Sequence, residues 1–155
     1  MAKDTPRPLD RFDSRILEIL SREGRIPVTA LAQAVGLSKT PCQTRLKRLQ
    51  DEGYILGFQA LLDPHKLNRA HIAFVEVKLS STREGALEAF NAAVASVPEI
   101  EQCHMIAGAF DYLLKVRTEN IESYRRVLGE EINALPHVSS TSTHVSMQAV
   151  KDKLG

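Results

Sequence analysis

The first run of hydrophobic residues with helical spacing covers roughly residues 11–22. Asp10 precedes this run, and a second acid, Asp13, follows three positions later, a spacing that predicts a capping box at the helix N-terminus. Gly24 is a plausible stop at the other end. Residues 1–9 hold two prolines and no periodic pattern, so we expect them to form a flexible arm.

Two further helical segments follow, and a glycine separates them. Val28–Val35 places its apolar residues on one side and ends at Gly36, which readily adopts the positive φ of a tight interhelical turn. Ser38 is a suitable N-cap for the next helix, which we expect to run to about Glu52 and to stop at Gly53. A helix, a glycine turn and a capped second helix are typical of a helix-turn-helix.

The rest of the chain follows strand-like and mixed patterns. Tyr54–Leu62 is apolar, which favours a strand or a wing, and residues 59–70 form a strand or linker to the second half. The later pattern reads strand, helix, strand, strand, helix, strand, the order of a ferredoxin-like βαββαβ domain. The expected elements are a strand at 72–79, a helix at 83–97, strands at 100–106 and 110–116 joined at Gly108, a helix from Asn120 to Pro136 and a strand at 138–150. The predicted fold class is α+β, with domains at residues 1–58 and 71–155.

The charge is unevenly shared between these two predicted domains. The net charge of the chain is +1; residues 1–58 hold 10 Lys+Arg against 7 Asp+Glu, a net of +3, and residues 59–155 hold 10 against 12, a net of −2. A basic first domain is compatible with nucleic-acid binding. The sequence has no long apolar run and no secretory signal, so we expect a cytoplasmic protein without a membrane partner.

The second helix of the predicted pair has a face suited to DNA. At about 100° per residue, Cys42, Leu46 and Leu49 form one stripe, which we expect to be buried. The opposite face carries Thr40, Thr44, Lys47 and Arg48, with Gln43 and Arg45 on its flanks. Such side chains contact phosphates and base edges in the major groove of double-stranded DNA. Each of them also fits an ordinary solvated surface; their combination on one acid-free face indicates a DNA-reading helix.

The predicted βαββαβ domain leaves one face of its sheet without a helix. The first strand has apolar residues on both of its faces, so the uncovered face needs a cover. A second copy of the same sheet is the simplest cover, and we therefore expect at least a homodimer.

Several sequence stretches carry a family resemblance. LSKTPCQTRLKRLQDEGYI, GFQALLDPHKL, QCHMIAGAFDYLLKVRT, YRRVLGE and LPHV occur in this order, within about residues 9–150. Together they resemble the leucine-responsive regulatory protein family (Lrp/AsnC). The resemblance implies a winged helix-turn-helix, then a ferredoxin-like ligand-sensing domain that dimerises and often assembles to octamers. By position, Ser38, Lys39, Thr40, Gln43, Thr44, Arg45 and Arg48 match the DNA-facing helix of that family, and Lys47 lies on the same outward face.

The resemblance also implies an amino acid effector bound between sensing domains. The residues that match the effector-responsive region are His104, Met105, Gly108, Asp111 and Tyr112. Asp111 could accept the ammonium group and backbone N–H groups near Gly108 could hold the carboxylate, although a hairpin glycine and a surface acid are the plain alternative. Three departures from the family pattern also belong to the predicted site: Ala109 replaces a common Asp, and His144 and Ser146 replace a more aromatic and aliphatic pattern in the last strand.

The sequence therefore predicts a transcriptional regulator of amino-acid metabolism, with leucine, proline or a similar amino acid as effector. It shows no nucleophile beside a base, no paired carboxylates and no phosphate loop, so we do not expect an enzyme. We expect no cofactor and no metal, because Cys103 and His104 are neighbours in a strand and point to opposite faces. The alternative function is an architectural DNA-binding protein of the same fold that needs no ligand.

Overall fold

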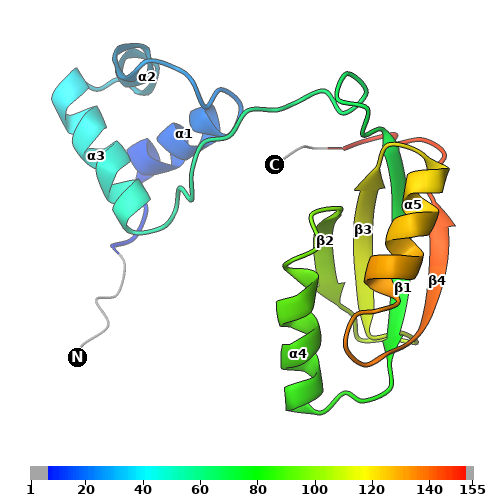
Figure 1. The fold of residues 1–155 in the computed structure, drawn as a ribbon. Coiled ribbons are helices and arrows are strands. Elements are labelled where there is room, and N and C mark those ends of the chain that lie inside the picture. Colours follow the sequence, from blue (N-terminus) through cyan, green and yellow to red (C-terminus); the bar gives the residue numbers. More distant parts are fainter. Residues whose placement is uncertain (1–6, 153–155) are drawn as a thin grey trace. The chain divides into compact units, whose positions relative to one another are not determined.

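The computed structural model describes residues 7–152, and the chain divides into two compact units, residues 1–60 and 61–155 (Figure 1). Each unit is described separately below. Residues 1–6 of the predicted flexible arm lie outside the described residues. Among residues 7–152, no helix is both long enough and apolar enough to cross a membrane.

The N-terminal unit consists of three helices, α1 (Arg11–Leu20), α2 (Val28–Val35) and α3 (Lys39–Asp51). Each contributes to a small core in which Ile16, Leu31, Cys42 and Leu49 are fully buried. The expected capping box is present at the start of α1. Gly36 follows α2 with φ at 76°, the left-handed conformation that the turn into α3 requires, and Gly53 has the same φ after α3.

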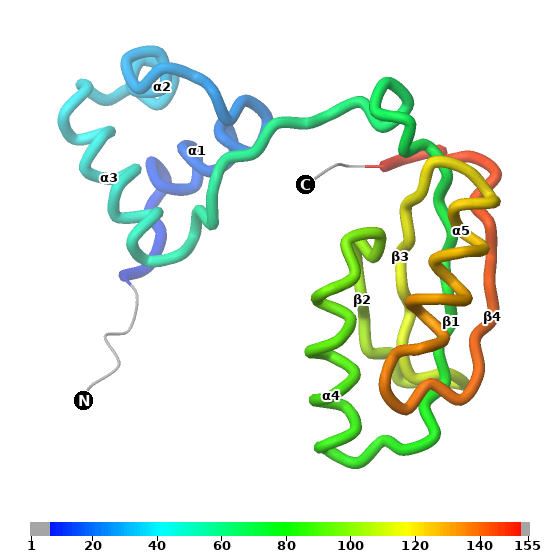
Figure 2. The backbone as a smooth tube through the Cα atoms, viewed as in Figure 1, coloured from blue at the N-terminus to red at the C-terminus, as the bar shows by residue number. Residues whose placement is uncertain are grey.

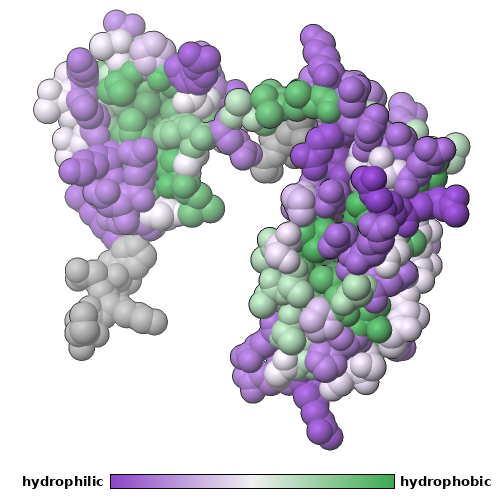
Figure 3. Space-filling view, viewed as in Figure 1, coloured by the Kyte–Doolittle hydropathy of each residue, from purple (hydrophilic) through white to green (hydrophobic). Residues whose placement is uncertain are grey.

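Three expectations for this unit were wrong in detail. The helix α1 ends at Leu20, and Gly24 is not its stop, since its φ is not positive. Leu46 is half-buried and lies outside the core that contains Cys42 and Leu49. Tyr54–Leu62 forms no strand, and a strand needs a neighbour to satisfy its backbone groups, which this segment lacks among the described residues. Hydrophobic side chains instead lie exposed along the segment that joins the two units, Leu56 being 96% exposed (Figure 3).

The C-terminal unit has the expected βαββαβ order (Figure 2). Its elements are β1 (His71–Leu79), α4 (Glu84–Val94), β2 (Ile100–Met105), β3 (Tyr112–Thr118), α5 (Ile121–Val127) followed by the π-helical turn η1 (Leu128–Ile132), and β4 (Val138–Val145). The strands form one antiparallel sheet in the order β2-β3-β1-β4. The ferredoxin-like fold class is thus confirmed. Asn120 caps α5 as expected, its side chain accepting from the Ser123 N–H at 2.9 Å.

The core of this unit lies between one face of the sheet and both helices. Alternate residues of β1 and β3 pack against Phe90 of α4 and Tyr124 of α5 in a single buried cluster. Three elements are shorter than the sequence predicts: α4 ends at Val94, ahead of Pro98, the last helix ends with η1 at Ile132 rather than at Pro136, and β4 ends at Val145 rather than at residue 150. The strand predicted at 110–116 lies at Tyr112–Thr118. Val145 lies opposite Ala73, near the start of β1, so residues beyond Val145 have almost no partner strand left to pair with.

The opposite face of the sheet carries charge as well as apolar surface. Arg117 and Lys115 of β3 lie on this face and are 5% and 9% exposed. Arg117 Nε pairs with a Glu101 carboxylate oxygen at 2.6 Å, and Lys115 Nζ lies 3.3 Å from Asp152 Oδ2. Phe74 of β1 lies on the same face and remains 37% exposed. Among residues 61–152 no helix covers this face, as predicted, but the chain's own charged residues cover part of it.

Candidate nucleic-acid interface

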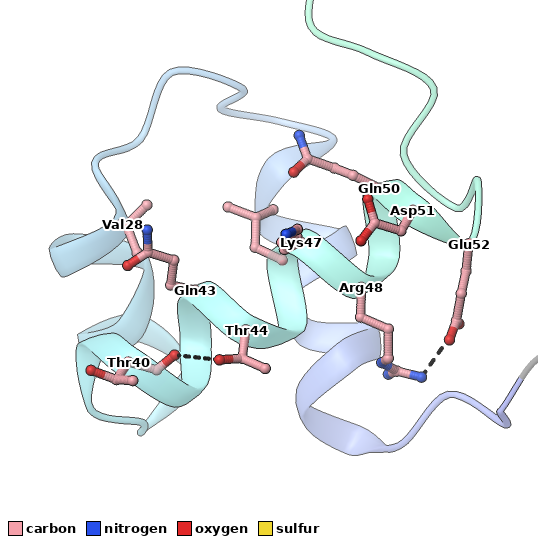
Figure 4. Close-up of a pocket in the computed structure, with 10 residues that line it drawn as sticks. Val28, Thr40, Gln43, Thr44, Lys47, Arg48, Gln50, Asp51 and Glu52 are labelled. Atoms are coloured by element: carbon pink, nitrogen blue, oxygen red, sulfur yellow. Dashed lines mark hydrogen bonds and ion pairs between the residues drawn. The ribbon is translucent and has the colours of Figure 1, made fainter.

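The exposed side of α3 carries most of the predicted DNA-binding side chains. Ser38 is the N-cap residue of α3, although its side chain makes no capping hydrogen bond. Lys39 is exposed at the start of the helix. Exposed side chains continue along it in Thr40, Gln43, Thr44 and Lys47 (Figure 4). An open groove of about 760 Å³ follows this side of α3 and is lined by Val28, Thr40, Gln43, Thr44, Leu46, Lys47, Arg48, Gln50, Asp51 and Glu52. The structure therefore presents hydroxyl, amide and ammonium groups in one accessible row.

Two of the predicted bases, Arg45 and Arg48, are held inside the unit by acids of α1. Arg45 Nη1 donates to Asp10 Oδ2 at 2.6 Å and to Asp13 Oδ1 at 2.9 Å. Arg48 Nη2 donates to Asp13 Oδ2 at 2.6 Å, and its Nη1 lies 3.4 Å from a Glu52 carboxylate oxygen (Figure 4). The two guanidinium side chains are only 26% and 21% exposed. They connect the middle of α3 to the first turn of α1.

The acids that hold these arginines are ionised at neutral pH. The backbone N–H of Asp13 donates to the Asp10 carboxylate and, with Arg45, lowers the pKa of Asp10 to about 2. Asp13 is 1% exposed, and burial acts to raise its pKa. The backbone N–H of Asp10 and the guanidinium groups of Arg48 and Arg45 outweigh that effect, so the pKa of Asp13 is lowered. Both acids therefore face the arginines as full negative charges.

The sequence identified Asp10 and Asp13 only as a helix cap and missed their second role. A capping box explains two acids three residues apart without any distant partner. Their pairing with Arg45 and Arg48 spans more than 30 residues of chain. Phe12, between the two acids, adds a further contact, since the Arg45 guanidinium carbon lies 5.3 Å from the centre of its ring. The only signal in the sequence was the pair of acids at the start of α1 together with the stretch of α3 from Lys39 to Arg48, which holds four bases and no acid.

In the C-terminal unit, the connection between β2 and β3 brings together part of the predicted effector site. Asp111 is tied to the end of β1, because its Oδ2 accepts from the Leu79 N–H at 2.7 Å and its N–H donates to the Val77 carbonyl at 2.9 Å. Lys78 Nζ donates to the Ala109 carbonyl at 3.3 Å. Gly108 lies exposed in the same connection. The carboxylate of Asp111 thus already has a structural hydrogen bond on one of its oxygens.

The remaining predicted effector residues are spread over the unit. His104 and Met105 are exposed at the end of β2, whereas Tyr112 is buried and packs on Phe90 with ring centres 4.5 Å apart. His144 pairs with Glu76 at 3.2 Å. The N–H of Ser146 donates to the Ile72 carbonyl, near the start of β1, while Asp111 bonds near its end. At about 3.3 Å per residue, Ser146 lies roughly 20 Å along β1 from Asp111, so one chain does not bring these residues together.

Side chains that could ligate a metal do not gather in the described part of either unit. Within residues 7–152, no group of three or more His, Cys, Asp or Glu side chains is placed to hold a metal ion. Cys42 is buried in the core of the N-terminal unit, and burial raises the pKa of its thiol. Cys103 is half-buried, and burial raises its thiol pKa as well. Neither thiol has the lowered pKa of a reactive cysteine.

Comparisons with known proteins agree with both units. Residues 9–55 match the family model of a winged helix-turn-helix DNA-binding domain, and residues 72–154 match that of the Lrp/AsnC ligand binding domain. A proline dehydrogenase transcriptional activator of Rhizobium radiobacter is 69% identical over 144 residues, which cover 93% of this chain and 92% of that protein. This chain belongs to the Lrp/AsnC family. The resemblance seen in the sequence is confirmed.

Other members of the Lrp/AsnC family are similar over nearly the same length. The leucine-responsive regulatory protein of Salmonella typhimurium is 46% identical over 145 residues, covering 94% of this chain and 88% of that protein. An AsnC family regulator from Agrobacterium tumefaciens matches with a TM-score of 0.89 at 32% identity, and a transcriptional regulator from Neisseria meningitidis, solved as a complex with L-Met, with 0.89 at 29%. Both structural matches cover 95% of each chain. This Lrp/AsnC chain is a DNA-binding transcriptional regulator with a ligand-binding domain.

Proposed function

We propose that this regulator reads its operator through the exposed side of α3 and that an amino acid bound by the C-terminal unit modulates its assembly or its affinity for DNA. The observation that carries the DNA part is the accessible row of Thr40, Gln43, Thr44 and Lys47 on α3. Thr and Gln offer base-specific contacts in the major groove, and Lys47 offers a phosphate contact. Ser38 and Lys39 add a hydroxyl and a charge at the start of the same helix.

Two relatives support a proposed target gene. The regulators of Rhizobium radiobacter and Rhodobacter capsulatus, 69% and 52% identical to this chain, are both proline dehydrogenase transcriptional activators. We infer that this chain activates a proline dehydrogenase gene and that proline, the substrate of that enzyme, is its effector. Leucine is the alternative, because the leucine-responsive regulatory protein of Salmonella typhimurium is 46% identical.

Effector binding is proposed at the connection between β2 and β3. Gly108 leaves the backbone accessible, and Asp111 has one carboxylate oxygen, Oδ1, with no hydrogen bond among the described residues. These groups suit the carboxylate and the ammonium of an amino acid. Ser146 lies too far along β1 to complete such a site in one chain, whereas His144 lies opposite Phe74 and is bonded to Glu76. A second protomer would have to bring Ser146 to the site, which fits the homodimer that we propose, with assembly to an octamer beyond it.

The small size of the contact that a single α3 can make with DNA also supports a homodimer. A single recognition helix makes a small contact, and dimers of helix-turn-helix proteins bind two half-sites about one helical turn apart. The exposed Phe74 and the partly covered charged face of the sheet give the C-terminal unit a surface for association.

The amino-acid response is tested by thermal unfolding of the full chain with each of the twenty amino acids in turn. An amino acid present at about 100 times its Kd is expected to stabilise the protein by about 2.7 kcal/mol. We expect the largest rise in Tm with proline. A larger rise in Tm with leucine would identify leucine, not proline, as the effector. No rise in Tm with any of the twenty amino acids at millimolar concentration would favour the architectural, ligand-independent alternative.

A further inference from the structure

We propose that Asp13 is a positioning residue for DNA reading: its buried carboxylate holds Arg45 and Arg48, fixes α3 against α1 and keeps both arginines from serving as phosphate contacts. The proposal rests on the proposed role of α3 as the DNA-reading helix. It assigns sequence reading to the exposed side chains of α3 and assigns its arginines to holding the helix in place.

The geometry concentrates three donors on one buried carboxylate. Asp13 Oδ1 accepts from Arg45, and Oδ2 accepts from Arg48 at 2.6 Å and from the Asp10 N–H at 3.0 Å. Asp10 binds Arg45 with its other oxygen while capping α1 through the N–H groups of Phe12 and Asp13. The same two carboxylates therefore start α1 and hold α3. A shift of α3 relative to α1 would break charge-assisted hydrogen bonds, which are the stronger kind in proteins.

Moving either arginine to a DNA phosphate would be costly. Asp13 is 1% exposed, so its carboxylate depends on Arg45 and Arg48 in place of water. Removing one partner of a buried ion pair leaves an uncompensated buried charge, which is strongly unfavourable. Phe12 adds apolar and cation–π contact to Arg45, which further holds its guanidinium.

The charges available to DNA are then fewer than the sequence suggests. Arg45 and Arg48 are balanced by Asp10 and Asp13, two positive charges against two negative. Of the four bases between residues 39 and 48, Lys39 and Lys47 are exposed and have no ion pair among the described residues. DNA affinity should therefore depend on salt through the lysines and on base sequence through Thr40, Gln43 and Thr44.

A different binding mode, in which Arg45 and Arg48 leave Asp13 and contact DNA phosphates, predicts the opposite changes in DNA affinity. Arg45 and Arg48 line a depression of about 410 Å³ beside α3, together with Arg7, Thr40, Pro41 and Thr44. If DNA phosphates occupied this depression and drew the arginines away from Asp13, the acid would compete with DNA for them. Removing the negative charge of Asp13 would then strengthen DNA binding and steepen its salt dependence.

The decisive variant is Asp13→Asn in the full chain, with Glu18→Gln as the matched control on the same helix. Glu18 pairs with Arg15 and Arg22 at the surface, where ion pairs contribute little. We expect Asp13→Asn to lower the Tm of the N-terminal unit by roughly 10 °C. At a temperature where the variant is still folded, specific DNA affinity should fall at least tenfold relative to non-specific affinity, with an unchanged salt slope. Glu18→Gln should leave the Tm, the specific DNA affinity and the salt slope unchanged.

Tighter DNA binding by Asp13→Asn with a steeper salt slope would overturn the proposal, and so would a variant that behaves like Glu18→Gln. If Asp13→Asn does not fold, Arg48→Gln provides the test: an unchanged salt slope supports the proposal, and a shallower slope contradicts it. If the wild-type chain binds no specific DNA, the proposed function fails. The contact between Asp13 and Arg48 is then tested by the Tm shifts of Asp13→Ala, Arg48→Ala and the double variant. A double-variant shift smaller than the sum of the two single shifts supports the contact, and a shift equal to the sum refutes it.

Discussion

Phe90→Ala is expected to destabilise the C-terminal unit by about 3–5 kcal/mol, because it deletes a fully buried aromatic side chain and leaves a cavity. Phe90 packs on Tyr112 and lies in the cluster that joins α4 to β1 and β3. The N-terminal unit has a separate core, built around Ile16 and Leu31, and should keep its own stability. Urea unfolding followed by amide hydrogen exchange separates the two units. The expected pattern is lost protection in the C-terminal unit alone.

Phe74→Ala is the matched control for this prediction. It also removes a phenylalanine side chain, but from β1, on the sheet face that points away from Phe90 of α4, where Phe74 is 37% exposed. At a protein concentration low enough to keep the chain monomeric, the destabilisation should be clearly smaller than for Phe90→Ala. Equal effects of the two substitutions would contradict the assignment of the core to the helical face.

Lys47→Ala is expected to weaken DNA binding about 60-fold at 0.1 M salt, by a similar factor on specific and non-specific sequences. Each phosphate contact changes the slope of log K against log salt by about 0.9, and a dimer would lose two contacts. Lys47 is exposed on α3 and has no ion-pair partner among the described residues, so its replacement should not disturb the fold. Fluorescence anisotropy with labelled promoter DNA measures the affinity.

Arg125→Ala serves as the charge-matched control for Lys47→Ala. It removes one positive charge from an exposed position of α5 in the other unit. The affinity for DNA should remain within about twofold of wild type, since no phosphate contact is lost. Equal weakening by the two substitutions would mean that overall charge, rather than the exposed side of α3, governs binding.

Much of the fold could be predicted because local signals agreed with tertiary packing. Gly36 has the positive φ expected of a turn between helices, and Asp10 caps α1. The βαββαβ order followed from the alternation of apolar residues in strands. The predicted strand at Tyr54–Leu62 failed because a strand is defined by its neighbour, and apolar composition cannot supply one. The strand β4 ends early for the same reason, because its partner β1 begins at His71 and offers no residues for pairing beyond that point.

The candidate site was harder to predict, because its contacts join residues that are distant in sequence. A helical wheel placed Arg48 with Lys47 on the outward side of α3, since it uses only the geometry of one helix. The structure separates the two: Lys47 is exposed, and Arg48 bonds to Asp13 from another helix. In the same way, the sequence grouped Ser146 with Asp111, and the strand register places them near opposite ends of β1.

The measurement that tests the central claim most directly is the salt dependence of promoter binding by wild type, Lys47→Ala and Arg48→Gln. If the exposed side of α3 contacts DNA while its arginines are held by α1, Lys47→Ala should reduce the slope of log K against log salt by about 1.8 per dimer. Arg48→Gln should leave that slope at the wild-type value. A wild-type slope for Lys47→Ala together with a reduced slope for Arg48→Gln would contradict the account.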